Sequence, residues 1–114
     1  MSALPRIHRI KKVGGDIRAI LRAPQQVSGG PLSYRSIRTI GAAKCIVSIP
    51  ARIIPRATMR NTIKRRITEA VRSIITANAL KNVSLMIVVR SSEVPVGSAL
   101  SEELMRYFKK SGIL

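Results

Sequence analysis

The chain is poor in aromatic residues, in cysteine and in long apolar runs, and each shortage excludes something. With two tyrosines, one phenylalanine and no tryptophan, the core must be largely aliphatic. The single cysteine, Cys45, can build neither an internal disulfide framework nor a cysteine zinc site, and its place in an expected strand predicts a small buried residue. No apolar run approaches the ~20 residues that a membrane span needs. The N-terminus shows no hydrophobic region of the signal-peptide type.

Residues that protein active sites use are equally scarce. The only histidine, His8, lies in a basic segment, where we interpret it as solvated or phosphate-facing. Among the scattered carboxylates, only Glu102 and Glu103 are adjacent, and on a helix they would point ~100° apart. We interpret them as partners of the helix dipole. No phosphate-binding glycine loop and no Ser/His/Asp set is visible. We therefore expect no catalytic residue in the protein, and no metal or other cofactor bound by the protein alone.

Positive charge is the dominant feature that is present. The chain has 21 Lys+Arg against 5 Asp+Glu, a net charge of +16 and a pI of about 11.8. Only Asp16 among the acids precedes Glu69. Because such a surface has few internal partners for its cations, phosphates are the natural counter-charge, and we favour a nucleic acid as the partner. A merely soluble basic surface, or an anionic membrane as partner, would also fit these numbers.

The hydrophobic pattern predicts one domain over residues 1–114, beginning with a basic arm at residues 1–13. That arm superficially resembles a transit peptide, but its removal would leave too little chain to close a domain. We expect, in order, a helix over 16–22, strands over 32–40 and 44–49, a helix from about 57 to 80, a central strand over 83–89 and a helix over 98–110. The predicted fold is a small α+β sandwich in the order α-β-β-(β)-α-β-α.

Individual residues are expected to end or cap these elements. Asp16 and Ser98 are predicted N-caps, Gly41 is predicted to end its strand, and Lys81–Asn82 is predicted to close the long helix. Buried faces are predicted for the first and the last helix, formed by Ile17, Ile20 and Leu21 and by Leu100, Leu104, Tyr107 and Phe108, respectively.

The long helix carries the most informative segment, MRNTIKRRITEAVR, at residues 59–72. At about 100° per residue it sorts into two faces. The face predicted to be buried consists of Met59, Ile63, Ile67, Ala70, Val71 and Ile74. The adjoining face, predicted to be exposed, consists of Arg60, Asn61, Lys64, Arg65, Thr68 and Arg72. Such a helix presents cations to a polyanion from a rigid platform.

The hexapeptide Arg60-Asn61-Thr62-Ile63-Lys64-Arg65 resembles the R-N-x-x-K-R helix opening of the protein component of bacterial ribonuclease P. Ala57 upstream, the strand 47–49, the strand end 88–90 and the helix 104–110 are also similar to that family. The family has a basic residue in place of Thr62 and of Thr68, and a Lys-Lys-x-Gly loop in place of residues 51–55. The aromatic positions of its first helix correspond to Ile17 and Leu21. The resemblance implies a ribosomal S5 domain 2-like fold.

The resemblance also implies a function: the protein would bind the catalytic RNA of ribonuclease P and the 5′ leader of precursor tRNA, in the cytoplasm. The RNA would hold the Mg²⁺ ions and carry out the phosphodiester cleavage, so the protein is the accessory subunit of an endoribonuclease. We predict RNA contacts from Arg52, Arg56, Arg60, Asn61, Lys64, Arg65 and Arg72. We predict leader contacts from Arg9, Lys11, Lys12, Ile17, Leu21 and Tyr34.

Two other classes of nucleic-acid-binding protein share some of these sequence features. A structural RNA-binding protein of ribosomal type would share the charge and the fold class. DNA is not expected, because the basic segment is followed by no coiled-coil heptads and flanked by no helix-turn-helix pair. No membrane partner is expected.

Overall fold

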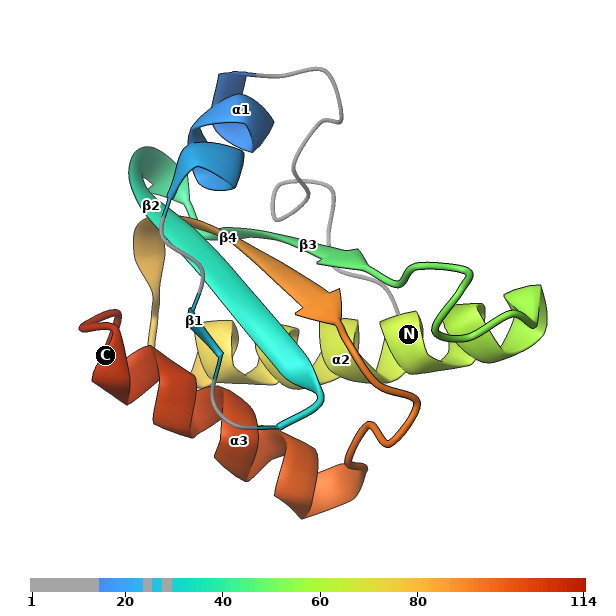
Figure 1. Cartoon of the computed structure of the whole chain (residues 1–114). Helices are drawn as coiled ribbons and strands as arrows, with labels where there is room; N and C mark the ends of the chain where they lie inside the picture. Colours follow the sequence, from blue (N-terminus) through green and yellow to red (C-terminus); the bar gives the residue numbers. More distant parts are fainter. Residues whose placement is uncertain (1–14, 24–25, 28–29) are drawn as a thin grey trace.

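The computed structural model describes residues 15–23, 26–27 and 30–114, which form a four-stranded sheet and three helices (Figure 1). The elements are α1 (Gly15–Arg22), β1 (Gln26–Val27), β2 (Leu32–Ala42), β3 (Lys44–Ser48), α2 (Ala57–Ala77), β4 (Lys81–Val89) and α3 (Gly97–Lys110). This order confirms the predicted α+β arrangement. The additional strand is β1, which precedes the two strands whose residue ranges were predicted before the long helix. Asp16, the predicted N-cap, lies inside α1 instead. In the described part of the chain, no helix is both long and apolar enough to cross a membrane.

The central strand of the sheet is β4, as its continuous apolar sequence predicts. The strand order is β1-β2-β4-β3, with β2 antiparallel and β3 parallel to β4. Only Ala43 separates β2 from β3, so the chain crosses the end of β4 there. Gly41 was expected to end β2, but the strand continues to Ala42 with a register irregularity. Gly41 supports this irregularity with a φ of 109°, and its N–H donates to Asn82 Oδ1 at 2.9 Å.

The two faces of the sheet are covered by different helices (Figure 1). The helices α2 and α3 cover one face, where the main core lies, and α1 lies on the other face, where Ile20 packs with Met86. Alternation along β4 explains the division, because successive side chains of a strand point to opposite faces. The residues of β4 in the main core are Val83, Leu85, Ile87 and Val89. Cys45 is buried in the same core, as predicted.

All three aromatic side chains of the chain lie in the main core. Tyr34 of β2 stacks on Tyr107 of α3, with ring centroids 4.1 Å and planes 9° apart. Tyr107 meets Phe108 edge-on at 5.8 Å, and its hydroxyl donates to Ser36 Oγ at 2.8 Å. The core is therefore aliphatic apart from one aromatic cluster that joins α3 to β2.

The predicted buried stripe of α2 is confirmed at Ile63, Ile67, Val71 and Ile74. Met59 is the exception: its side chain is 46% exposed, because the first turn of α2 extends past the end of the sheet (Figure 1). The helix ends at Ala77 instead of near residue 80, and the C-cap Asn78 donates its side-chain amide to the Ile74 carbonyl. Lys81 and Asn82, predicted to close the helix, are the first residues of β4.

The predicted buried face of α3 is confirmed at Leu100, Leu104, Tyr107 and Phe108. Its N-cap is Val96, which makes no side-chain capping bond, so the prediction for Ser98 is wrong. Glu103 is only 7% exposed, and a Cβ added to Gly30 would lie 2.5 Å from its Oε1. Glu103 is therefore buried beside Gly30. Neither Glu102 nor Glu103 lies in the first turn of α3, so our interpretation of them as partners of the helix dipole is wrong. Glu102 is exposed.

Candidate nucleic-acid interface

One flank of α2 gathers polar and cationic side chains, and its orientation is set by the core. Ile63, Ile67 and Val71 anchor the adjoining side of the helix in the main core. The residues of this α2 flank are Asn61, Lys64 and Arg65, which are exposed, and Thr68 and Arg72, which are half-buried. At about 100° per residue they fall within one sector of the helix surface. The structure thus brings together most of the cations that the sequence predicts for RNA contact.

Arg60 differs from the rest of the predicted set. It precedes Ile63 and Ile67 by three and seven residues, so it lies on the core-facing side of the helix. Its side chain is half-buried, and Nη1 donates to the Ile54 and Pro55 carbonyls at 2.9 and 2.8 Å. The prediction that Arg60 is exposed on the flank is therefore wrong. Its guanidinium group ties the start of α2 to the preceding loop.

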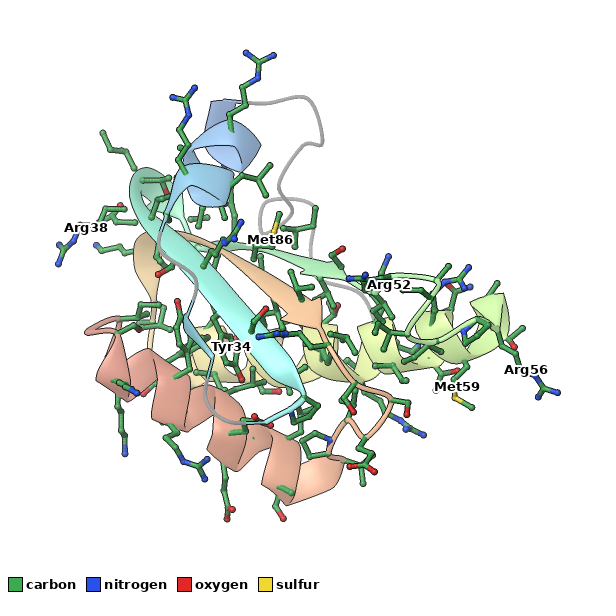
Figure 2. All side chains as sticks on the ribbon, in the orientation of Figure 1. Tyr34, Arg38, Arg52, Arg56, Met59 and Met86 are labelled. Carbon is green, nitrogen blue, oxygen red and sulfur yellow. The ribbon has the colours of Figure 1, made fainter. Side chains whose placement is uncertain are left out.

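The loop at residues 49–56, between β3 and α2, carries two more predicted RNA contacts. It turns sharply, because the amides of Ile53 and Ile54 both donate to the Pro50 carbonyl at 3.0 and 3.2 Å. Ile54 is 4% exposed and anchors the loop in the main core. Arg52 and Arg56 are both exposed, and Figure 2 shows Arg56 reaching into solvent beside Met59 at the start of α2. The Arg60 bonds therefore hold a loop that presents cations next to the α2 flank.

Arg72 occupies the other end of the flank and is more buried than Lys64 and Arg65. Its Nε is buried and has no hydrogen-bond partner among the described residues. A buried donor without a partner costs free energy, which water or a bound acceptor would recover. Arg66 is exposed, but it lies 100° around the helix from Arg65, toward the side away from Lys64.

The residues predicted to bind a leader separate into three groups. Leu21 of α1 is 51% exposed, and Arg35 of β2 donates from Nη1 to the Leu21 carbonyl at 3.2 Å. Arg9, Lys11 and Lys12, together with the side chain of Ile17, lie outside the described part of the structure. Tyr34 is 1% exposed in the main core.

The assignment of Tyr34 to leader contact is therefore wrong, because the alternation of β2 directs its ring toward α3. The same alternation puts Arg35 on the α1 side, where the sequence reasoning overlooked it. The tyrosine and phenylalanine rings are all buried, with exposed fractions of 1% for Tyr34, 3% for Tyr107 and 0% for Phe108. The described part of the chain thus offers no aromatic ring as a platform for base stacking.

The described residues offer little for covalent or metal chemistry. Burial raises the pKa of the Cys45 thiol to about 12, so the thiolate is essentially absent at neutral pH. Burial also raises the pKa of Tyr107. Within the described ranges, no three His, Cys, Asp or Glu side chains gather as a metal site. What the arrangement does offer is an array of cations on a rigid helix and loop, suited to phosphate contacts.

Comparison with known proteins gives one family and two similar structures. The family model described as Ribonuclease P matches residues 4–112 of the chain. The Staphylococcus aureus RNase P protein, solved at 2.0 Å, is similar with a TM-score of 0.69 and 15% identity, covering 93% of this chain and 96% of that one.

A mutant of the S. aureus RNase P protein with defective mRNA degradation activity is also similar, with a TM-score of 0.70 and 15% identity over 92% of this chain and 88% of that one. At 15% identity, these two structures show only that this chain has the same fold. No curated protein matches the chain.

Proposed function

The chain belongs to the ribonuclease P protein family, and from this premise we propose that its α2 flank and 49–56 loop bind the catalytic RNA of that enzyme. As a ribonuclease P protein subunit it binds RNA and acts in tRNA processing. The single observation that supports the flank as the contact is its geometry: Asn61, Lys64 and Arg65 are exposed together on a helix whose adjoining face is anchored in the core.

The physical basis of such binding is the release of counterions from phosphates. Cations fixed on a rigid helix lose little conformational freedom on binding, so more of the interaction energy remains as affinity. Asn61 adds an amide that can accept from a ribose 2′-hydroxyl or donate to a base edge.

The chemical step belongs, in this proposal, to the RNA. The catalytic RNA holds the Mg²⁺ ions that activate water for cleavage of the phosphodiester bond. The protein screens phosphates, stabilises the RNA fold and increases the affinity for precursor tRNA. We place this reaction in the cytoplasm.

Leader binding is proposed for the α1 side of the sheet, where Leu21 and Arg35 are the described contacts. Because no aromatic ring is exposed, a leader would be held by apolar and cationic side chains. The basic arm, with Arg9, Lys11 and Lys12, is the further source of cations.

Reconstitution tests this function directly. The full-length protein, a bacterial ribonuclease P RNA and precursor tRNA are combined, and removal of the leader is followed at low Mg²⁺ concentration. We expect stimulation by the wild-type protein and a clear loss with Arg65→Gln. The matched control is Arg66→Gln, which removes an exposed cation from another sector of the same helix.

A protein that gives no stimulation, but co-sediments with ribosomal subunits, would overturn the proposal in favour of a ribosomal-type role. Equal losses in the flank variant and in Arg66→Gln would show that total charge matters and not the α2 flank.

A further inference from the structure

An apolar pocket of about 250 Å³ opens at the first turn of α2, and none of the predicted functions uses it. The 49–56 loop forms one wall through Ile53, Ile54 and Pro55, and Met59 of α2 forms another. Arg56 and Ser92 add a cation and a hydroxyl to the lining. Figure 2 shows Met59 and Arg56 extending from the same end of the helix.

The floor and one wall of this pocket are fixed before any ligand arrives. Ile54 and Ile63 line it and are 4% and 6% exposed, so they belong to the main core. The Ile54 and Pro55 carbonyls are held by Arg60 Nη1 at 2.9 and 2.8 Å. Met59, at 46% exposed, is the apolar side chain of the lining that can adapt its rotamer to a ligand. A ligand would therefore enter a preorganised pocket, which lowers the entropic cost of binding.

The chemistry of the lining points to a flat apolar group carried by a polyanion. Apolar side chains and a methionine sulfur make favourable contacts with an aromatic ring, and an arginine can stack on its face. Arg56, whose side chain is exposed, supplies the cation of the lining. The lining residues, all within the described structure, include no carboxylate that would repel phosphates. Pockets for drug-sized ligands begin near 300 Å³, so this one suits a smaller group such as one base.

We propose that this pocket receives one unstacked nucleobase of the catalytic RNA, while Arg56 contacts a neighbouring phosphate. This inference rests on the proposed function and adds a base contact to a surface otherwise described by phosphates alone. The buried state of Tyr34, Tyr107 and Phe108 strengthens it, because a base contact in the described part of the chain then uses apolar, methionine or arginine side chains. Met59 is an exposed large hydrophobic residue that lines this pocket together with Arg56.

The first test measures binding of the full-length protein to a short single-stranded oligoribonucleotide, with and without a single abasic residue at its centre. For the wild type we expect the abasic residue to weaken binding about 3- to 10-fold. In Met59→Gln, which keeps the length and the exposed position of the side chain, this penalty should fall to near one. The matched control is Ile40→Gln, because Ile40 is 98% exposed at the other end of the molecule and should retain the full penalty.

The second test observes the methionine methyl groups by NMR in the protein labelled at methionine. The oligoribonucleotide should shift the Met59 methyl signal, whereas inorganic polyphosphate, which carries charge without bases, should not. Met105 of α3, which is partly buried against the main core, is an internal reference. Equal shifts with both polyanions, or an unchanged abasic penalty in Met59→Gln, would overturn the base contact and leave the RNA-binding function intact. Failure of the wild type to bind the oligoribonucleotide, or catalytic RNA, would instead count against the proposed function.

The third test separates the two possible sources of the base. In the reconstituted holoenzyme, Met59→Gln is compared on precursor tRNA with a long leader and with a leader of one nucleotide. A base from the catalytic RNA predicts the same loss of protein affinity for that RNA whichever substrate is present. A loss that occurs only with the long leader would assign the pocket to the substrate and overturn the proposal as stated.

Discussion

The two faces of the sheet differ sharply in how much apolar surface they bury. On the face covered by α2 and α3, a continuous core runs from Leu32 to Phe108 and includes residues of both helices and three strands. On the α1 face, the buried cluster consists of Ile20 and Met86, with Ile37, Ile46 and Val88 partly buried around it. Since burial of apolar area is the main source of stability, the helix-covered face holds the fold together. Because the α1 face contributes less to stability, its side chains can take part in binding at a smaller cost to the fold.

The largest expected effect tests the helix-covered face. Ile67 is 0% exposed, so Ile67→Asp would place an unpaired charge in the core. We expect a loss on the order of 4 kcal/mol in the free energy of unfolding, enough to unfold much of the protein. Thermal melting followed by circular dichroism measures this, with Ile40→Asp as the exposed control. A wild-type melting curve for Ile67→Asp would mean that the assignment of the α2 faces is wrong.

A smaller effect is expected when the α1 face is weakened. Ile20→Ala removes the buried anchor of α1, and we expect a cost of about 2 kcal/mol, at the low end for such truncations. The amides of α1 should then exchange with deuterium faster than those of β4, because α1 can detach without unfolding the sheet. Ile67→Ala is the matched truncation on the other face and should cost more. Equal losses in the free energy of unfolding for Ile20→Ala and Ile67→Ala, together with equal exchange rates for the amides of α1 and β4, would show that the two faces contribute equally to stability.

Cys45 lies on the helix-covered face, and the pH dependence of stability tests how completely that face is shielded from water. Burial raises the pKa of its thiol from 9.0 to about 12, so folding favours the protonated form. This contribution is fully present below pH 9.0 and is lost as the pH rises toward about 12. At pH 10 the loss is on the order of 1 kcal/mol. Urea unfolding at pH 8 and pH 10 measures it, and Cys45→Ala should lack this component. If the free energy of unfolding falls by the same amount between pH 8 and pH 10 in the wild type and in Cys45→Ala, the thiol is not shielded from solvent.

The smallest effects on stability are expected for Arg60 and Arg65, the two arginines that begin and end the hexapeptide at residues 60–65. Arg60→Met removes two hydrogen bonds to the 49–56 loop and should cost about 1 kcal/mol. Arg65→Met should change stability by less than about 0.5 kcal/mol but lower the salt dependence of binding to catalytic RNA by about one phosphate contact. Chemical denaturation and binding at several salt concentrations measure both quantities. An unchanged salt slope in Arg65→Met would exclude that side chain from the interface.

Much of the helix-covered face could be predicted because it obeys simple periodicity. Ile63, Ile67 and Val71 recur at helical spacing, and the apolar run 83–89 is too continuous for anything but a central strand. Errors occur where the partner of a residue is distant in sequence. Glu103 is buried beside Gly30, and neither position carries a sequence signal for the other.

The sequence by itself determined the order of elements, the sign of the surface charge, the family resemblance and the grouping of Lys64 and Arg65 on one flank. Local rules suffice for these properties, because each depends on residues within a few positions of one another. The tertiary structure alone decided that Met59 projects beyond the sheet, that Arg60 binds loop carbonyls and that Tyr34 stacks inside the core. Those outcomes depend on where the sheet ends and on which segment packs against it. The periodicity of a helix or a strand carries no information on either point, because it describes only neighbouring residues of one element.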